Sequence, residues 1–313
     1  MWRRSLSAGY RCFECRRGGP KGIWSSPAVR ACSMPACPAG RITALEAIDL
    51  WKRCFEKRGV AEPEHSSQYI IAHLLGAKTI ESVEQERLTE FLSQEQTEQV
   101  WKLCSKRLSS MPVQYVIEEW DFRDLTLKMR PPVFIPRPET EELVELVLAD
   151  LQMKSGTQHT CLEVGCGSGA ISLSLLKSVP QVKFVSVVAT FYVLSLCSSV
   201  SALVSNPPYL FSEDMASLQP DIFRFEDHAA LDGGTDGLNV IKQILTLAPQ
   251  ILSSEGRVYL EVDPRHPPLI RRWVEVNVEE LQYVETRHDI SGRPRFCILQ
   301  KEKSNKDHEL DLN

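Results

Sequence analysis

Apolar residues recur at three- and four-residue steps through much of residues 42–110, with Gln- and Glu-rich faces opposite. This spacing predicts amphipathic helices. A helix start is expected at Thr43, because Glu46 three residues later completes a capping box, and Gly59 stands where helices commonly end. We therefore expect a small N-terminal helical domain over residues 42–110, without residues that suggest catalysis.

The pattern changes at residue 111. Residues 111–138 combine Pro, β-branched and aromatic residues in short alternating runs, which predict a linker with a hairpin. From Glu139 a helix is expected, and then short apolar strands alternate with helices, which is typical of an α/β fold with a largely parallel sheet. This domain spans 139–303, and residues 304–313 form a polar tail. The expected strands lie at 161–164, 182–188, 201–205, 257–262, 281–288 and 295–300, and two further helices at 236–252 and 267–280.

A glycine-rich turn follows the strand expected at 161–164. It reads Glu-Val-Gly-Cys-Gly-Ser-Gly from Glu163 to Gly169. Glycines let the backbone turn tightly and let a ligand approach the main chain, while the following helix offers free N–H groups at its start. In open α/β sheets nucleotides bind at such turns. The acid before the glycines favours S-adenosylmethionine over NAD, and a tight turn without any ligand is the alternative.

A second motif, Asn206-Pro-Pro-Tyr209, follows the apolar strand expected at 201–205. The prolines have fixed φ angles and no N–H group, so they stiffen the corner. A planar NH2 group can then give its two hydrogens to the side-chain oxygen of Asn206 and to the carbonyl of Pro207, which are positioned in advance. Tyr209 can stack on the flat group. The corner therefore suits methylation of an amide or amino nitrogen without a strong general base.

Five stretches together resemble the HemK family of protein N5-glutamine methyltransferases, which methylate the Gln of the Gly-Gly-Gln motif in peptide chain release factors. They lie at 134–145, 162–176, 203–210, 230–238 and 291–296. The resemblance covers about residues 42–302. It implies an α/β fold: a class I S-adenosylmethionine-dependent methyltransferase (Rossmann-like) domain with a small N-terminal helical domain. It also implies S-adenosylmethionine as the cofactor and no metal site.

The resemblance assigns roles residue by residue. The cofactor-binding residues it implies are Glu163, Gly165, Cys166, Gly167, Ser168, Gly169 and Asn206. The substrate-binding residues it implies are Asn206, Pro207, Pro208 and Tyr209, with Asn206, Pro207 and Tyr209 as the catalytic ones. The stretches 137–140 and 232–236 would form walls of the site, although a turn-forming role for Asp232 and Asp236 is an equal alternative.

The family pattern fails between Gly169 and Asn206. An acid that takes the ribose hydroxyls of the donor is expected near Val188, yet no Asp or Glu occurs from 164 to 212. Only 36 residues separate Gly169 from Asn206, roughly half of what the intact run of strands and helices needs. We interpret the segment around 183–202 as truncated or replaced, as in a splice variant or a faulty gene model.

The run at 184–205 carries no charge over 22 residues, which is long enough to span a membrane. Its six serines and its position between two methyltransferase motifs favour a buried insertion over a membrane span. No membrane association is therefore expected.

Charge is unevenly distributed along the 313 residues, whose net charge is −5. Residues 1–41 hold eight basic residues and one acid, a net of +7, and the remainder carries −12. The basic, acid-poor start is typical of a mitochondrial transit peptide, with a disordered basic arm as the alternative. It resembles the mitochondrial branch of the family, whose substrates would be mitochondrial release factors. The acidic body argues against a basic groove for a phosphate backbone, so stable nucleic-acid binding is not expected.

The chain has ten cysteines. Four lie in the basic segment with a spacing that could hold zinc, but little strand or helix pattern there would position the ligands. These four are Cys12, Cys15, Cys32 and Cys37. The other six are dispersed, and we interpret them as reduced thiols in or near the core.

Two other functions stay open. An N6-adenine nucleic-acid methyltransferase could use the same corner to hold an adenine amino group. Because the ribose acid is missing, the other alternative is an impaired isoform, a non-catalytic remnant that binds release factors but has lost the donor site.

Overall fold

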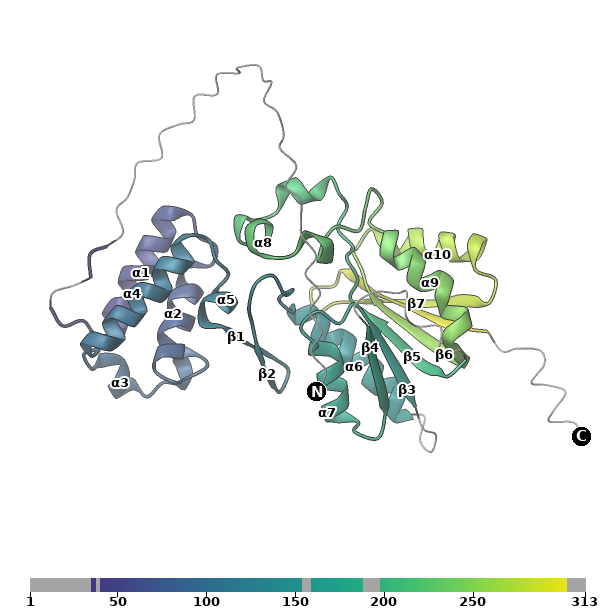
Figure 1. Cartoon of the computed structure of the whole chain (residues 1–313), viewed down its shortest axis with the longest axis horizontal. Helices are drawn as coiled ribbons and strands as arrows, with labels where there is room; N and C mark the ends of the chain where they lie inside the picture. Colours follow the sequence, from purple (N-terminus) through teal and green to yellow (C-terminus); the bar gives the residue numbers. More distant parts are fainter. Residues whose placement is uncertain (1–34, 38–39, 154–158, 188–197, 303–313) are drawn as a thin grey trace, which may run out of the picture. The chain divides into compact units, whose positions relative to one another are not determined.

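The computed structural model describes residues 35–37, 40–153, 159–187 and 198–302 (Figure 1). The basic leader, except for its last few residues, and the polar tail at 304–313 lie outside these residues, as does Val188. Of the four cysteines considered as zinc ligands only Cys37 is described, and it is an exposed free thiol.

Helices fill the region expected to be helical. They are α1 (Ala44–Arg58), α2 (Pro63–Leu74), the short 3-10 helix η1 (Ile80–Ser82), α3 (Gln85–Thr89) and α4 (Gln94–Leu108). A further short helix, α5 (Val113–Ile117), lies in the stretch 111–138, where a linker with a hairpin was expected. The predicted capping box is confirmed, because the Thr43 hydroxyl accepts from the Glu46 N–H and the Glu46 carboxylate accepts from the Thr43 N–H. Gly59 ends α1 with a φ of 66°. The core of this bundle includes Trp51, whose ring meets that of Trp101 edge-on at 5.2 Å.

A short hairpin and one long helix connect the helical bundle to the sheet. Strands β1 (Glu119–Phe122) and β2 (Leu125–Lys128) pair antiparallel, as the alternating pattern predicts. Helix α6 (Pro138–Met153) follows, with Glu139 and Glu141 in its first turn, where carboxylates favour the positive end of the helix dipole.

Among the described residues, six strands form the main sheet, in the order β4-β3-β5-β6-β8-β7. Their bounds are β3 (Thr160–Val164), β4 (Lys183–Val187), β5 (Val200–Ser205), β6 (Leu252–Glu261), β7 (Leu281–His288) and β8 (Pro294–Lys301). Strands β4, β3, β5 and β6 are parallel, and β8 is antiparallel to both of its neighbours. This arrangement confirms the predicted α/β fold with a largely parallel sheet.

The uncharged run at 184–205 contributes its two ends to β4 and β5, and its middle lies outside the described residues. Across the part of the chain that the structure describes, none of the helices has the length and apolar character needed to cross a bilayer.

Helices cover both faces of the sheet (Figure 1). Helices α6 and α7 (Ala170–Ser178) pack on one face, and α9 (Asn239–Ile251) and α10 (His266–Asn277) pack on the other. Because side chains alternate along a strand, neighbouring residues join different cores: Cys161 and Ala202 face α6 and α7, whereas Leu162 and Leu203 face α9 and α10. The predicted helix at 236–252 is shorter than expected, because residues 232–237 form a glycine-rich turn before it.

That turn packs tightly against the corner at residues 206–210. The Leu210 N–H donates to the Leu231 carbonyl at 2.9 Å, and the Gly233 N–H donates to the Leu210 carbonyl at 2.8 Å. A Cβ atom on Gly233 would lie 2.8 Å from the Pro208 carbonyl oxygen. The two segments therefore approach so closely that the turn has no room for a side chain there, and the turn braces the corner from behind.

Gly237→Ala is expected to destabilise the protein more than Gly59→Ala. Both glycines have a left-handed φ, +69° at Gly237 and +66° at Gly59, so backbone strain is matched at roughly 1–2 kcal/mol. A Cβ at Gly59 meets nothing within 4 Å, whereas at Gly237 it would lie 2.6 Å from the Tyr209 carbonyl oxygen. We expect this overpacking to cost a further ~1–3 kcal/mol in the free energy of unfolding, measured by chemical denaturation. Equal losses in the two variants would contradict the proposed bracing.

Candidate active site

A cavity of about 560 Å³ opens beyond the carboxyl ends of β3 and β5. In an open α/β sheet this is where ligands bind. The structure brings nearly all of the sequence-predicted site residues together there: Glu163, Gly165, Cys166, Gly167, Ser168, Asn206, Pro207, Pro208 and Tyr209 line the cavity. Gly169 is the exception, because it is the N-cap residue just before α7 and does not line the cavity.

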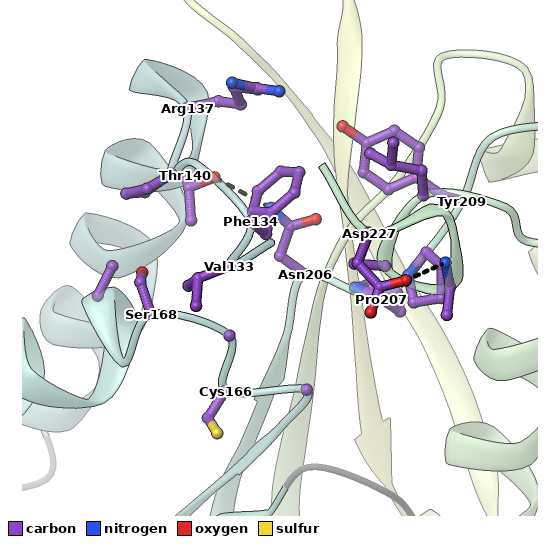
Figure 2. A pocket seen from close by; sticks show the side chains of 18 of the residues that line it. Val133, Phe134, Arg137, Thr140, Cys166, Ser168, Asn206, Pro207, Tyr209 and Asp227 are labelled. Carbon is purple, nitrogen blue, oxygen red and sulfur yellow. Dashed lines mark hydrogen bonds between the residues drawn. The ribbon is translucent and has the colours of Figure 1, made fainter. Parts of the chain in front are cut away.

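The glycine turn forms one wall of the cavity. Gly165, Gly167 and Gly169 all have left-handed φ angles, 78°, 48° and 77°, which side-chain-bearing residues rarely adopt. A Cβ at Gly165 would come within 4.0 Å of the Asn206 carbonyl oxygen, and one at Gly167 within 3.9 Å of Phe134 Cβ. The missing side chains thus leave a cradle between the turn and the corner. The turn carries Cys166 and Ser168 across the pocket from Asn206 and Pro207 (Figure 2).

Glu163 lies beneath this turn and is 1% exposed. Burial raises the pKa of its carboxyl to about 7, because the ionised form loses water, although hydrogen bonds from Ser172 and Ser186 oppose the shift. The Ser186 hydroxyl on β4 donates to Glu163 at 3.2 Å. The carboxylate therefore ties the end of β3 to β4 on one side and to the start of α7 on the other.

Asn206 forms the other wall together with Thr140 from α6 (Figure 2). The Asn206 side-chain amide donates through Nδ2 to Thr140 Oγ1 at 3.1 Å, and the Thr140 hydroxyl donates to Glu261 at 2.7 Å. Among the described residues none donates to Asn206 Oδ1. That oxygen is therefore available to accept a hydrogen from a bound NH2 group.

Tyr209 closes the same network from the corner. Its hydroxyl donates to the Glu261 carboxylate at 3.2 Å. Burial and the neighbouring Glu261 raise the pKa of the phenol, so the hydroxyl stays protonated and acts as a donor. The ring is thereby fixed at the edge of the cavity.

Arg137 and the residues around it form the far wall. The Arg137 guanidinium pairs with Glu226 at 2.6 Å and lies 5.0 Å from the centre of the Phe134 ring. Glu226 follows helix α8 (Pro220–Phe225) and is buried, so this pair joins the start of α6 to the segment that covers the cavity. Arg137 and Thr140, which were expected to form a wall of the site, both line the cavity.

Asp232 and Asp236 have the turn-forming role. Asp232 accepts hydrogen bonds from the Gly234 N–H and the Ser212 hydroxyl, both at 2.8 Å. Asp236 accepts from the Leu238 N–H and pairs with Lys242. Neither residue lines the cavity, so the alternative of direct contact with a ligand is not supported.

Sequence reasoning missed several residues of the site. Phe134 and Asp227 line the cavity, and Glu261 lies behind Asn206 and Tyr209. Glu261 has one signal in the sequence, since it is an acid near the end of the apolar run at 257–262. The lining from 218 to 231 lacks such a signal, because its short helices follow no extended apolar pattern.

The chain is similar to several known proteins. Residues 46–117 match the family model described as the PrmC N-terminal domain. The chain is 42% identical over 324 residues to the human protein named MTRF1L release factor glutamine methyltransferase, with 91% of this chain and 94% of that protein covered. It is 29% identical to the release factor glutamine methyltransferase of Thermodesulfovibrio yellowstonii, covering 76% and 92%. A solved protein-(glutamine-N5) methyltransferase from Alicyclobacillus acidocaldarius aligns at 24% identity over 56% of this chain and 99% of that one, with a TM-score of 0.39.

Glu163→Gln is expected to change how stability depends on pH. Because the pKa of Glu163 is about 7 in the folded state and lower in the unfolded chain, its favourable contribution is present at acidic pH and is lost as pH rises through about 7. The free energy of unfolding of the variant, relative to wild type, should therefore rise by ~2 kcal/mol between about pH 5.5 and about pH 8. Denaturant titrations at both pH values measure this. The exposed carboxylate Glu275 on α10 provides a control, since Glu275→Gln should follow wild type; a Glu163→Gln variant that also follows it would contradict the assignment.

Proposed function

The chain belongs to the family of release factor glutamine methyltransferases, and we propose that it methylates the Gln side-chain nitrogen in the Gly-Gly-Gln motif of mitochondrial peptide chain release factors. The observation that carries this proposal is the geometry of Asn206. Its Nδ2 is engaged by Thr140 while its Oδ1 is left for a ligand, directly beside Pro207 and across from the glycine turn. A carboxamide NH2 group is the chemical partner that this arrangement fits.

The residues at the glycine turn fit S-adenosylmethionine. The turn keeps a cradle free of side chains, and Gly169, the N-cap residue of α7, has no side chain to cap the first turn of the helix. We propose that Glu163 and the turn from Gly165 to Gly169 hold the donor, together with Asn206. Bound there, S-adenosylmethionine supplies an electrophilic methyl group.

The corner is proposed to orient the substrate nitrogen. An amide nitrogen is a poor nucleophile because its lone pair is delocalised. Asn206 Oδ1 and the Pro207 carbonyl accept its two hydrogens, which fixes the NH2 group and directs the nitrogen toward the turn. Pro208 stiffens the corner, and Tyr209 packs against the flat group. The two acceptors thus orient the nitrogen without a strong general base, and the proton that the nitrogen loses on methylation passes to solvent.

We propose the following division of the chain. Residues 1–41 act as a mitochondrial transit peptide, which their net charge of +7 supports. Residues 42–110 form the helical domain, 111–138 the linker and 139–303 the methyltransferase domain. The match of residues 46–117 to the PrmC N-terminal domain supports the helical domain as a separate unit of the family, although that match extends into the linker.

We also propose that the segment around 183–202 is truncated or replaced. Only twelve residues connect the end of β4 at Val187 to the start of β5 at Val200. Such a connection is at the lower limit for a crossover between parallel strands. The same stretch supplies no acid for the ribose of the donor.

Asn206→Ala should abolish methyl transfer to a release factor that carries the Gly-Gly-Gln motif. Losing one positioned polar group of this kind lowers turnover by roughly 100-fold or more. Transfer of a radiolabelled methyl group measures the effect, and the exposed Asn277→Ala at the end of α10 is the matched control that keeps activity. Wild-type protein that binds the release factor without methylating it would point to the non-catalytic alternative, and methylation of adenine in DNA or RNA instead would overturn the proposed substrate.

Binding of S-adenosylmethionine by this chain should be weaker than micromolar. Hydrogen bonds that an acid makes to the ribose are worth ~1.5–3 kcal/mol, or roughly ten- to hundred-fold in affinity, and this chain has no acid from 164 to 212 to make them. Calorimetric titration measures the affinity, and Val188→Asp, at the position where the acid is expected, should tighten it. Micromolar binding by the unmodified chain would show that the ribose acid is dispensable.

A further inference from the structure

We propose that Glu261 is a positioning residue: through the Thr140 hydroxyl, it fixes which end of the Asn206 side-chain amide faces the substrate. The inference rests on the proposed function, since it concerns how the same corner presents an acceptor to the substrate nitrogen. Glu261 itself does not line the cavity.

The three side chains form a linear chain of hydrogen bonds. Thr140 Oγ1 donates to Glu261 Oε2 at 2.7 Å and receives the Nδ2 hydrogen of Asn206 at 3.1 Å. Glu261 comes from the end of β6, Thr140 from the first turns of α6 and Asn206 from the corner after β5. Three segments that are distant in the sequence therefore meet in one chain of contacts.

The direction of these hydrogen bonds follows from counting protons. An ionised carboxylate can only accept, and a threonine hydroxyl has a single hydrogen to give. Once Thr140 gives its hydrogen to Glu261, it can only accept from Asn206. Asn206 must then turn its NH2 toward Thr140, and its Oδ1 is left for the substrate. Glu261, which does not contact the substrate, thus determines that Asn206 presents an acceptor and not a donor to the substrate nitrogen.

Burial makes the chain of contacts rigid. Glu261 is 1% exposed and Thr140 is 2% exposed, so water has little access to replace either partner. The second carboxylate oxygen of Glu261 accepts from the Tyr209 hydroxyl at 3.2 Å. Both oxygens of the carboxylate are therefore occupied by donors, and each donor belongs to a residue at the edge of the cavity or within its lining.

The carboxyl of Glu261 gains or loses its proton close to neutral pH, chiefly because it is buried. Burial raises the pKa of its carboxyl to about 7, and the negative charge of Glu139 on α6 adds to this shift. The shift is opposed by hydrogen bonds from Thr140 and Tyr209 and by the positive charge of Arg295 on β8. Arg295 is itself held by Asp289 at 3.4 Å and by the Val262 carbonyl at 3.1 Å. A protonated Glu261 could donate to Thr140, which would then donate to Asn206 Oδ1. The amide would be reversed, and the substrate nitrogen would face a donor.

Thr140→Val and Thr140→Ser test the chain of contacts as a matched pair. Valine keeps the shape of threonine without the hydroxyl, and serine keeps the hydroxyl. We expect Thr140→Val to lower kcat by roughly ten- to hundred-fold, and Thr140→Ser to stay within about threefold of wild type. A second readout is calorimetric: with S-adenosylhomocysteine present, Thr140→Val should bind a Gly-Gly-Gln peptide at least about tenfold more weakly than wild type does, whereas Thr140→Ser should bind it within about threefold of wild type.

The pH profile tests Glu261 itself. For wild type, kcat/KM should rise as the pH increases through about 7, because the ionised carboxylate is the form that orients Asn206. Glu261→Gln should remove this rise. The exposed Glu275→Gln on α10 is the control, and it should retain the rise.

The outcomes separate this inference from the proposed function. If wild type does not methylate the release factor or bind the peptide, the proposed function fails and the inference fails with it. If wild type is active but Thr140→Val and Thr140→Ser behave alike, or Glu261→Gln keeps the wild-type pH profile, the proposed function stands and the positioning role is overturned. Thermal unfolding of each variant identifies any that is misfolded, and the serine variant and the pH profile then decide the question.

Discussion

The register between the parallel strands β3, β5 and β6 is the constraint on which the site depends. Glu163 on β3 lies level with Val204 on β5, and Ser205 on β5 lies level with Leu260 on β6. This pairing brings the end of each strand to one edge of the sheet, so that Glu163, the Asn206 corner and Glu261 lie around one cavity. A shift by one residue would turn every side chain of a strand to the opposite face and separate these groups.

The sequence predicts those parts of the site that lie within one short segment. The glycine turn and the Asn-Pro-Pro-Tyr corner are visible because left-handed φ angles and a stiff bend require particular residue types at fixed spacing. The contacts of Glu261 with Thr140 and Tyr209 depend instead on strand register and on where α6 begins, which local pattern does not encode. The same holds for the fold: strand positions follow from periodicity, whereas the order of strands and the packing of the 232–237 turn behind the corner follow from tertiary contacts.

Two buried carboxylates flank the cavity, and both are costly to keep charged. Glu163 ties the glycine turn to the sheet, and Glu261 lies behind the corner, each with a pKa near 7. A core of apolar residues at both positions would be more stable at neutral pH, because burial disfavours an ionised carboxyl. Their presence fits a site whose polar groups must hold fixed directions. The two carboxyls lower the stability of the fold, but they orient the neighbouring hydrogen-bond donors and acceptors.

Strand β4 lies at one edge of the described sheet. Among the described strands it pairs only with β3, so one row of its backbone N–H and C=O groups meets no other described strand. Such a row is a template on which a second polypeptide can add a strand. The cavity lies at the ends of β3 and β5 and not along this edge, so two molecules could join there while each keeps its site intact.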